Sequence, residues 1–114
     1  MPSRLSAPAR RFLADDVHSV MQLELVLLLH RDRDAAWTAM GLARELRTAE
    51  PWVAGELVDL VALGAARATD GAVPTYRAEA GGPLTPAIEE VAALYPTLRT
   101  TIITLIFQSS PDDR

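Results

Sequence analysis

The chain has 114 residues, 49% of them hydrophobic and 23% charged, so it is long enough for one domain with its own core. It contains no cysteine, which excludes disulfides, thiol catalysis and thiolate-ligated zinc. No run approaches the roughly 18 apolar residues of a membrane-spanning helix, and the N-terminal sequence lacks a secretion-signal pattern, so we expect a cytoplasmic protein that does not bind membranes.

The charge is divided unevenly along the chain. Residues 1–14 carry three arginines and no acidic residue, whereas the rest carries eight arginines and fifteen acidic residues, a net charge of −7. Pro2 and Pro8 lie among small polar residues, and we predict a flexible basic arm over residues 1–13. Nucleic-acid-binding domains usually have a basic patch on the folded body, so the acidic body argues against strong DNA binding.

The segment SVMQLELVLLLHR predicts a first helix. We expect Asp15 or Asp16 to cap it and Arg31 to lie near its end. On a helical wheel its apolar residues fall on both sides. A helix that is apolar almost all round must be covered on more than one face.

Residues 35–37 predict a short strand, and two short helices follow it. Thr38 is expected to cap the second helix, AMGLARELR, and Thr48 the third. The third helix tolerates Pro51 in its first turn and should end at Gly64. Its expected inner face comprises Val53, Leu57, Leu60, Val61 and Gly64.

A hairpin and a long final helix complete the expected elements. Asp70 and Gly71 predict a turn between extended runs at residues 65–69 and 73–78. The last helix should be capped by Thr85, run to about Gln108 and be kinked near residues 94–95 by Pro96. Its segment TTIITLIF is β-branched enough for a strand, although we favour a helix. Residues 109–114 are expected to be a frayed tail.

The segment LARELRTAEPWVAGELVDLVALG, with the predicted hairpin, resembles the core of bacterial winged helix-turn-helix transcriptional regulators. The residues that carry the resemblance, which covers about residues 15–80, are Leu42, Ala43, Leu46, Val53, Leu57, Leu60, Gly64, Asp70 and Gly71. It implies a mostly α, α+β fold, with a three-helix core and two-stranded wing over residues 14–80. A helix over residues 84–108 follows.

In such regulators the outward side of the third helix contacts base edges and the wing contacts phosphates, so the resemblance implies duplex DNA binding. Arg67 and Arg77 should lie opposite one another on the wing, which is unfavourable unless an anion lies between them. The candidate DNA-binding residues are Arg4, Arg10, Arg11, Arg44, Arg47, Arg67 and Arg77.

The third helix itself suggests an alternative function. Its expected outward arc holds Trp52, Gly55, Glu56, Asp59 and Leu63, none of them a residue that commonly donates to purines. This arc is either a solvated acidic face with Trp52 folded under its edge or a protein-binding surface. In the second case the winged helix is a protein-interaction module that uses Trp52, Glu56, Asp59 and Leu63.

The first and last helices carry more apolar surface than a winged-helix core needs, which predicts a homodimer. Unless the last helix folds back on the first within one chain, the dimer residues are Leu94, Tyr95, Leu98, Ile102, Leu105 and Ile106. No catalytic motif or phosphate-binding loop is present. His30 with Asp32 and Asp34 lies in a charged turn that does not fix metal geometry, so we expect a non-enzyme with no cofactor and no metal.

Overall fold

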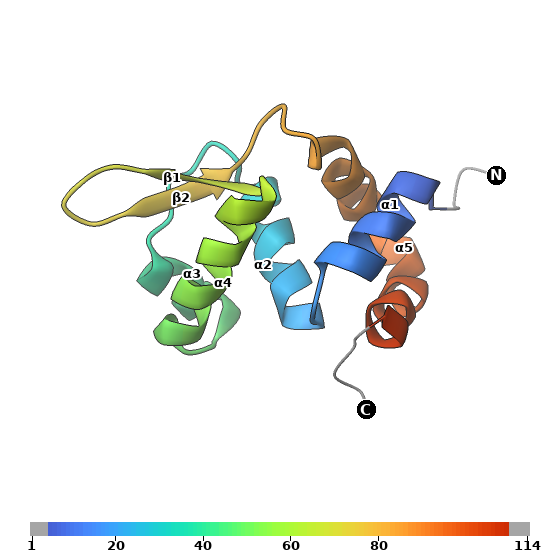
Figure 1. Cartoon of the computed structure of the whole chain (residues 1–114). Coiled ribbons are helices and arrows are strands. Elements are labelled where there is room, and N and C mark those ends of the chain that lie inside the picture. Colours follow the sequence, from blue (N-terminus) through green and yellow to red (C-terminus); the bar gives the residue numbers. More distant parts are fainter. Residues whose placement is uncertain (1–4, 110–114) are drawn as a thin grey trace.

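A computed structural model describes residues 5–109. This part of the chain is mostly helical with one two-stranded antiparallel sheet, which confirms the expected mixture of helices and a hairpin. Figure 1 shows the hairpin at one end of the molecule and α1 beside α5 at the other. The elements are α1 (Ala7–Arg11), the π-helix η1 (Phe12–Asp16), α2 (Val20–Arg31), α3 (Ala39–Leu46), α4 (Glu50–Leu63), β1 (Ala66–Thr69), β2 (Thr75–Ala78) and α5 (Thr85–Ser109).

The segment before α2 is folded, so the predicted flexible arm over residues 1–13 is wrong for its described part. The Ser6 hydroxyl caps α1 by accepting the Ala9 N–H at 3.3 Å, and it also donates to the Glu90 carboxylate at 2.6 Å. Phe12 and Leu13 are buried in η1, which packs against α5. The burial of these apolar side chains, and not the charge of the neighbouring arginines, holds the segment against α5.

Helix α2 begins later than predicted. Asp15 and Asp16 belong to η1, and Ser19 is the N-cap of α2, where its hydroxyl accepts the Gln22 N–H at 3.0 Å. The Gln22 side chain reaches back and accepts the His18 N–H at 2.6 Å. This reciprocal arrangement is close to a capping box, whose sequence signature is a serine followed three residues later by a glutamine.

Helix α2 forms the centre of the core, which confirms that it is covered on more than one face. Leu23, Leu25 and Leu29 are no more than 1% exposed. The helix contacts α3, β2 and α5, three elements that follow it in the chain. A single hydrophobic cluster runs from Leu5 to Ile106 through this helix.

Helices α3 and α4 are consecutive and pack on each other across the turn at residues 47–49. Thr38 caps α3 as predicted, because its hydroxyl accepts the Gly41 N–H at 3.0 Å. The chain turns at Arg47, whose φ of 58° is left-handed. The cap predicted at Thr48 is wrong: Ala49 is the N-cap of α4, and it provides no side-chain hydrogen bond.

The end of α4 and the hairpin follow the sequence prediction closely. Gly64 ends α4 with a left-handed φ of 84°, a conformation that costs glycine little. Strands β1 and β2 pair antiparallel around a loop at residues 70–74. The predicted strand at residues 35–37 is reduced to one bridge, in which Trp37 and Tyr76 exchange backbone hydrogen bonds of 2.8 and 2.7 Å.

Helix α5 is helical through the β-branched segment, as favoured, and it is kinked as predicted. The non-helical residue is Leu98, with φ −109° and ψ 28°, so the kink lies after Pro96 and not before it. By length and composition alone, α5 is long and apolar enough to span a membrane, contrary to the expectation that no segment would be. In this structure one side of α5 packs on the protein core.

Helix α5 folds back on its own chain against α2, η1 and α1. Ile102 and Ile106 are 0% and 1% exposed, so their assignment to a dimer surface is wrong. The remaining candidate dimer residues are partly buried against the same core: Leu94, Tyr95, Leu98 and Leu105. Packing within the chain accounts for the apolar side of α5, and the homodimer stays a prediction.

Replacing Ile102 with alanine is expected to lower the free energy of unfolding by about 2–5 kcal/mol, because the cavity is left in a packed core. Phe107, which is 59% exposed on the same helix, is the control, and Phe107→Ala should cost about 0.5 kcal/mol or less. Denaturant titration followed by circular dichroism measures both. Equal stability of the two variants would contradict the packing of α5 within the chain.

Candidate functional site

Exposed large apolar side chains are concentrated on α3, α4 and the hairpin. Residues 5–109 contain five such side chains, and only Phe107 lies elsewhere, on α5. The other four are Met40 (44% exposed), Val58 (66%), Val61 (38%) and Val73 (62%). A concentration of exposed apolar groups marks a binding surface better than scattered ones do. We define the α4–hairpin face as Met40, Glu50, Ala54, Val58, Asp59, Val61 and Val73.

Helix α4 presents a different side to solvent from the one its helical wheel predicted. Trp52 and Leu63, expected to point outward, are half-buried and pack against the core, whereas Val61, expected inward, is exposed. Ala54, Val58 and Val61 are spaced four and three residues apart, so they form one stripe. The wheel was a poor guide because α4 has apolar residues on every side. Trp52 is therefore folded against the core, as expected if the acidic side of α4 is a solvated face.

The polar groups of α4 are acidic. Its sequence, EPWVAGELVDLVAL, contains no arginine, lysine, asparagine or glutamine. Glu50 and Asp59 are exposed, and Glu56 is half-buried. Burial, and then the nearby charge of Asp59, raises the pKa of Glu56. The helix therefore offers none of the side chains that most often donate hydrogen bonds to bases in the major groove.

A groove of about 320 Å³ opens where α3, α4 and the hairpin meet. It adjoins the apolar stripe of α4, because Ala54 belongs to both. Glu50 places a carboxylate on its wall. The lining residues are Thr38, Ala39, Met40, Glu50, Ala54, Val73, Pro74 and Tyr76. The groove gives the α4–hairpin face a mostly apolar recess with acidic character.

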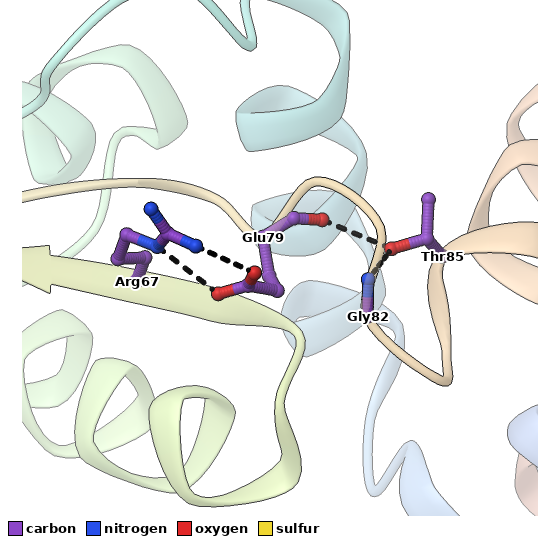
Figure 2. Close-up of polar contacts among 4 residues, drawn as sticks. All are labelled: Arg67, Glu79, Gly82 and Thr85. Atoms are coloured by element: carbon purple, nitrogen blue, oxygen red, sulfur yellow. Dashed lines mark hydrogen bonds and ion pairs between the residues drawn. The ribbon is translucent and has the colours of Figure 1, made fainter.

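The two hairpin arginines lie opposite each other, which confirms the predicted register, but Arg67 already has an anionic partner. Its Nε and one terminal nitrogen donate to the Glu79 carboxylate at 3.2 and 2.9 Å, as Figure 2 shows. The anion anticipated beside this arginine pair is thus supplied by the chain itself. Arg77 is half-buried, and its Nε has no hydrogen-bond partner among residues 5–109. A phosphate group would have to compete with Glu79 for Arg67.

Residues 79–85, which connect β2 to α5, form a hydrogen-bonded turn. The Thr85 hydroxyl donates to the Glu79 carbonyl at 3.0 Å and accepts the Gly82 N–H at 2.9 Å (Figure 2). Thr85 therefore closes this turn and does not cap α5, contrary to the prediction. A Cβ atom at Gly82 would lie 2.9 Å from Glu79 Cγ and 3.1 Å from the Gly64 carbonyl oxygen, so only glycine fits without a shift.

The other predicted DNA-binding arginines do not gather into one surface with the hairpin. Arg44 and Arg47 are exposed at the end of α3, and neither forms an ion pair within residues 5–109. Arg10 and Arg11 are exposed on α1, which lies at the opposite end of the molecule from the hairpin (Figure 1). Arg4 lies outside the described residues. The arginines of α1 and those of the hairpin therefore lie on separate parts of the surface.

Comparison with known proteins adds no family to this description. No family model matches the chain, and no matching curated protein or solved structure was found. Function is therefore inferred from the residues and geometry of the chain itself.

Replacing Glu56 with glutamine is expected to stabilise the protein at pH 7.5 by about 0.5 kcal/mol. Because the pKa of Glu56 is raised in the folded state, folding binds protons, and stability is lost as the pH rises from 4.5 through the raised pKa. The gain should therefore shrink toward zero near pH 4. Thermal unfolding across this range measures it, with Glu50→Gln on the same helix as the control. A gain that grows as the pH falls would contradict this account.

Proposed function

We propose that the chain is a winged-helix protein whose α4–hairpin face binds another protein. The order of α2, the Trp37 bridge, α3, α4 and the hairpin supports the winged-helix assignment. The short turn between α3 and α4 at residues 47–49 is consistent with a helix-turn-helix. In this arrangement α4 is the helix that DNA-binding members would insert into a groove.

The exposed apolar stripe of α4 is the observation that carries the protein-binding function. Val58 is 66% exposed at the middle of the helix, and Val73 is 62% exposed on the hairpin loop. Apolar groups at these positions gain free energy when a partner removes them from water, whereas a DNA groove offers them few matching surfaces. The stripe therefore favours a partner with its own apolar side chains.

The charges of the face define the partner further. Glu50 and Asp59 are exposed on the same helix as the stripe, and Asp70 lies in the hairpin loop with Val73. Complementary charge speeds and orients association more than it adds affinity. The partner we propose is a protein surface with apolar anchors flanked by lysine or arginine. Trp52 and Leu63, which the sequence placed in this interface, are partly buried against the core and do not belong to the exposed face.

Duplex DNA binding is the second candidate function, and one observation favours it. Arg44 and Arg47 are exposed next to the turn before α4 and have no ion-pair partner in the described chain. In a helix-turn-helix this position is near the phosphate backbone. Against it, Glu50 and Asp59 on α4 would be repelled by the same phosphates, and Arg67 is held by Glu79.

A mobility-shift titration with generic duplex DNA at low salt is expected to show no complex up to tens of micromolar protein, because non-specific affinity depends on neutralising phosphates. The double variant Arg44→Ala/Arg47→Ala is the matched control. A micromolar complex that weakens steeply with salt and is lost in this variant would establish DNA binding instead.

A photo-reactive side chain placed at Val73 is expected to form a covalent adduct with a protein in cells, and Val58→Asp should abolish that adduct. Val58→Thr, which keeps the shape of valine, should retain it, and circular dichroism should show that both variants fold. The same photo-reactive group at Thr100, exposed on α5, is the control position. Adducts of equal yield at Val73 and Thr100, or a yield unaffected by Val58→Asp, would refute the assignment.

A further inference from the structure

A second pocket lies away from the α4–hairpin face, where α2, the end of α3 and α5 meet. Its volume is about 480 Å³, which is within the range of small-molecule sites. It shares no residue with the groove beside the hairpin. The lining residues are Glu24, Leu27, Leu28, His30, Arg31, Glu45, Leu46, Ala92, Tyr95 and Pro96.

The walls of this pocket are mostly apolar. Leu27 and Leu28 come from α2, Leu46 from α3, and Tyr95 and Pro96 from the kinked part of α5. Helix α5 is interrupted beside the pocket, because Pro96 lies in the pocket lining and Leu98, two residues later, is non-helical. A flat apolar group bound here would be removed from water by all three helices.

The polar groups of the pocket have an unbalanced charge. Glu24 has no ion-pair partner within residues 5–109, and Glu45 lies 4.0 Å from Arg31. Arg31 is held more closely by Asp32, at 3.0 Å, outside the pocket lining. Two carboxylates of the lining therefore face one guanidinium that is already engaged. A ligand cation would correct this imbalance, whereas an anion would increase it.

Tyr95 provides a second unsatisfied group. Its hydroxyl is buried and has no hydrogen-bond partner in the described structure. Because this oxygen is inaccessible, the contribution of Tyr95 to the pocket wall comes from the rest of its side chain. The other side of the residue is engaged, because the Arg99 guanidinium lies 5.6 Å from the centre of the ring.

We propose that this pocket binds a small amphipathic amine. The apolar body of the ligand lies against Leu27, Leu46 and Pro96, and its ammonium group lies toward Glu24 and Glu45. The ligand is selected by a positive charge on a compact, mostly apolar body.

Three probes of nearly equal shape test the charge requirement: 2-phenylethylamine, 2-phenylethanol and phenylacetate. Titration of the ¹⁵N-labelled full chain, followed by amide chemical shifts, reports both the affinity and the position of binding. The amine should shift signals from the pocket lining and bind roughly tenfold more tightly than the alcohol. Phenylacetate should bind more weakly than either.

Glu24→Gln should reduce the affinity for the amine toward that of the alcohol and leave the alcohol unchanged. Glu50→Gln, which removes one charge from the α4–hairpin face, is the matched control and should change neither affinity. Equal affinities for the three probes, tighter binding of phenylacetate, or no pocket shifts at millimolar amine would overturn the proposal. Pocket shifts that follow protein concentration, with dimerisation in sedimentation, would show a second copy as the occupant and overturn it as well.

Discussion

The burial of α2 on several sides is the constraint on which the rest of this structure depends. A helix with Leu23, Leu25 and Leu29 all removed from water cannot lie at the surface of a small domain. Each such side chain contributes roughly 1.5–3 kcal/mol when it is buried, so the neighbouring elements gain most by covering it. Helix α3 and strand β2 contact α2, and α5 covers it from another side. The chain therefore folds from both directions onto one central helix.

This constraint also explains where apolar surface is left over. The apolar side of α5 is used on α2, η1 and α1, so Ile102 and Ile106 are not available to a second copy. The kink at Leu98 leaves a pocket between α5 and the end of α3. Four of the five exposed large apolar side chains of residues 5–109 lie on α3, α4 and the hairpin loop, and the hairpin is at the far end of the molecule from α1 (Figure 1). Two separate surfaces result, and we propose a protein partner for one and a small amine for the other.

Element order and electrostatics point to different functions for α4. The order of helices and hairpin supports our winged-helix proposal, and in the resemblance that class binds DNA, but the exposed groups of α4 are apolar or acidic. The hairpin arginine best placed for a phosphate is Arg67, and it binds Glu79 (Figure 2). Fold alone does not determine function, and the chemistry of the exposed groups has to decide between the candidates. That chemistry favours a protein partner with basic residues around apolar anchors.

The sequence alone determined the features that depend on neighbouring residues. The cap at Thr38, the end of α4 at Gly64 and the pairing of Arg67 with Arg77 follow from local conformational preferences and helical or strand spacing. Only the tertiary structure decided the features that depend on distant partners. Residues 7–16 fold because η1, which contains Phe12 and Leu13, packs against α5. The sequence did not decide which side of α4 faces solvent, because that helix has apolar residues on every side. Contacts between residues far apart in the chain leave no periodic pattern in the sequence. The folding of residues 7–16 and the solvent-facing side of α4 therefore could not be predicted from it.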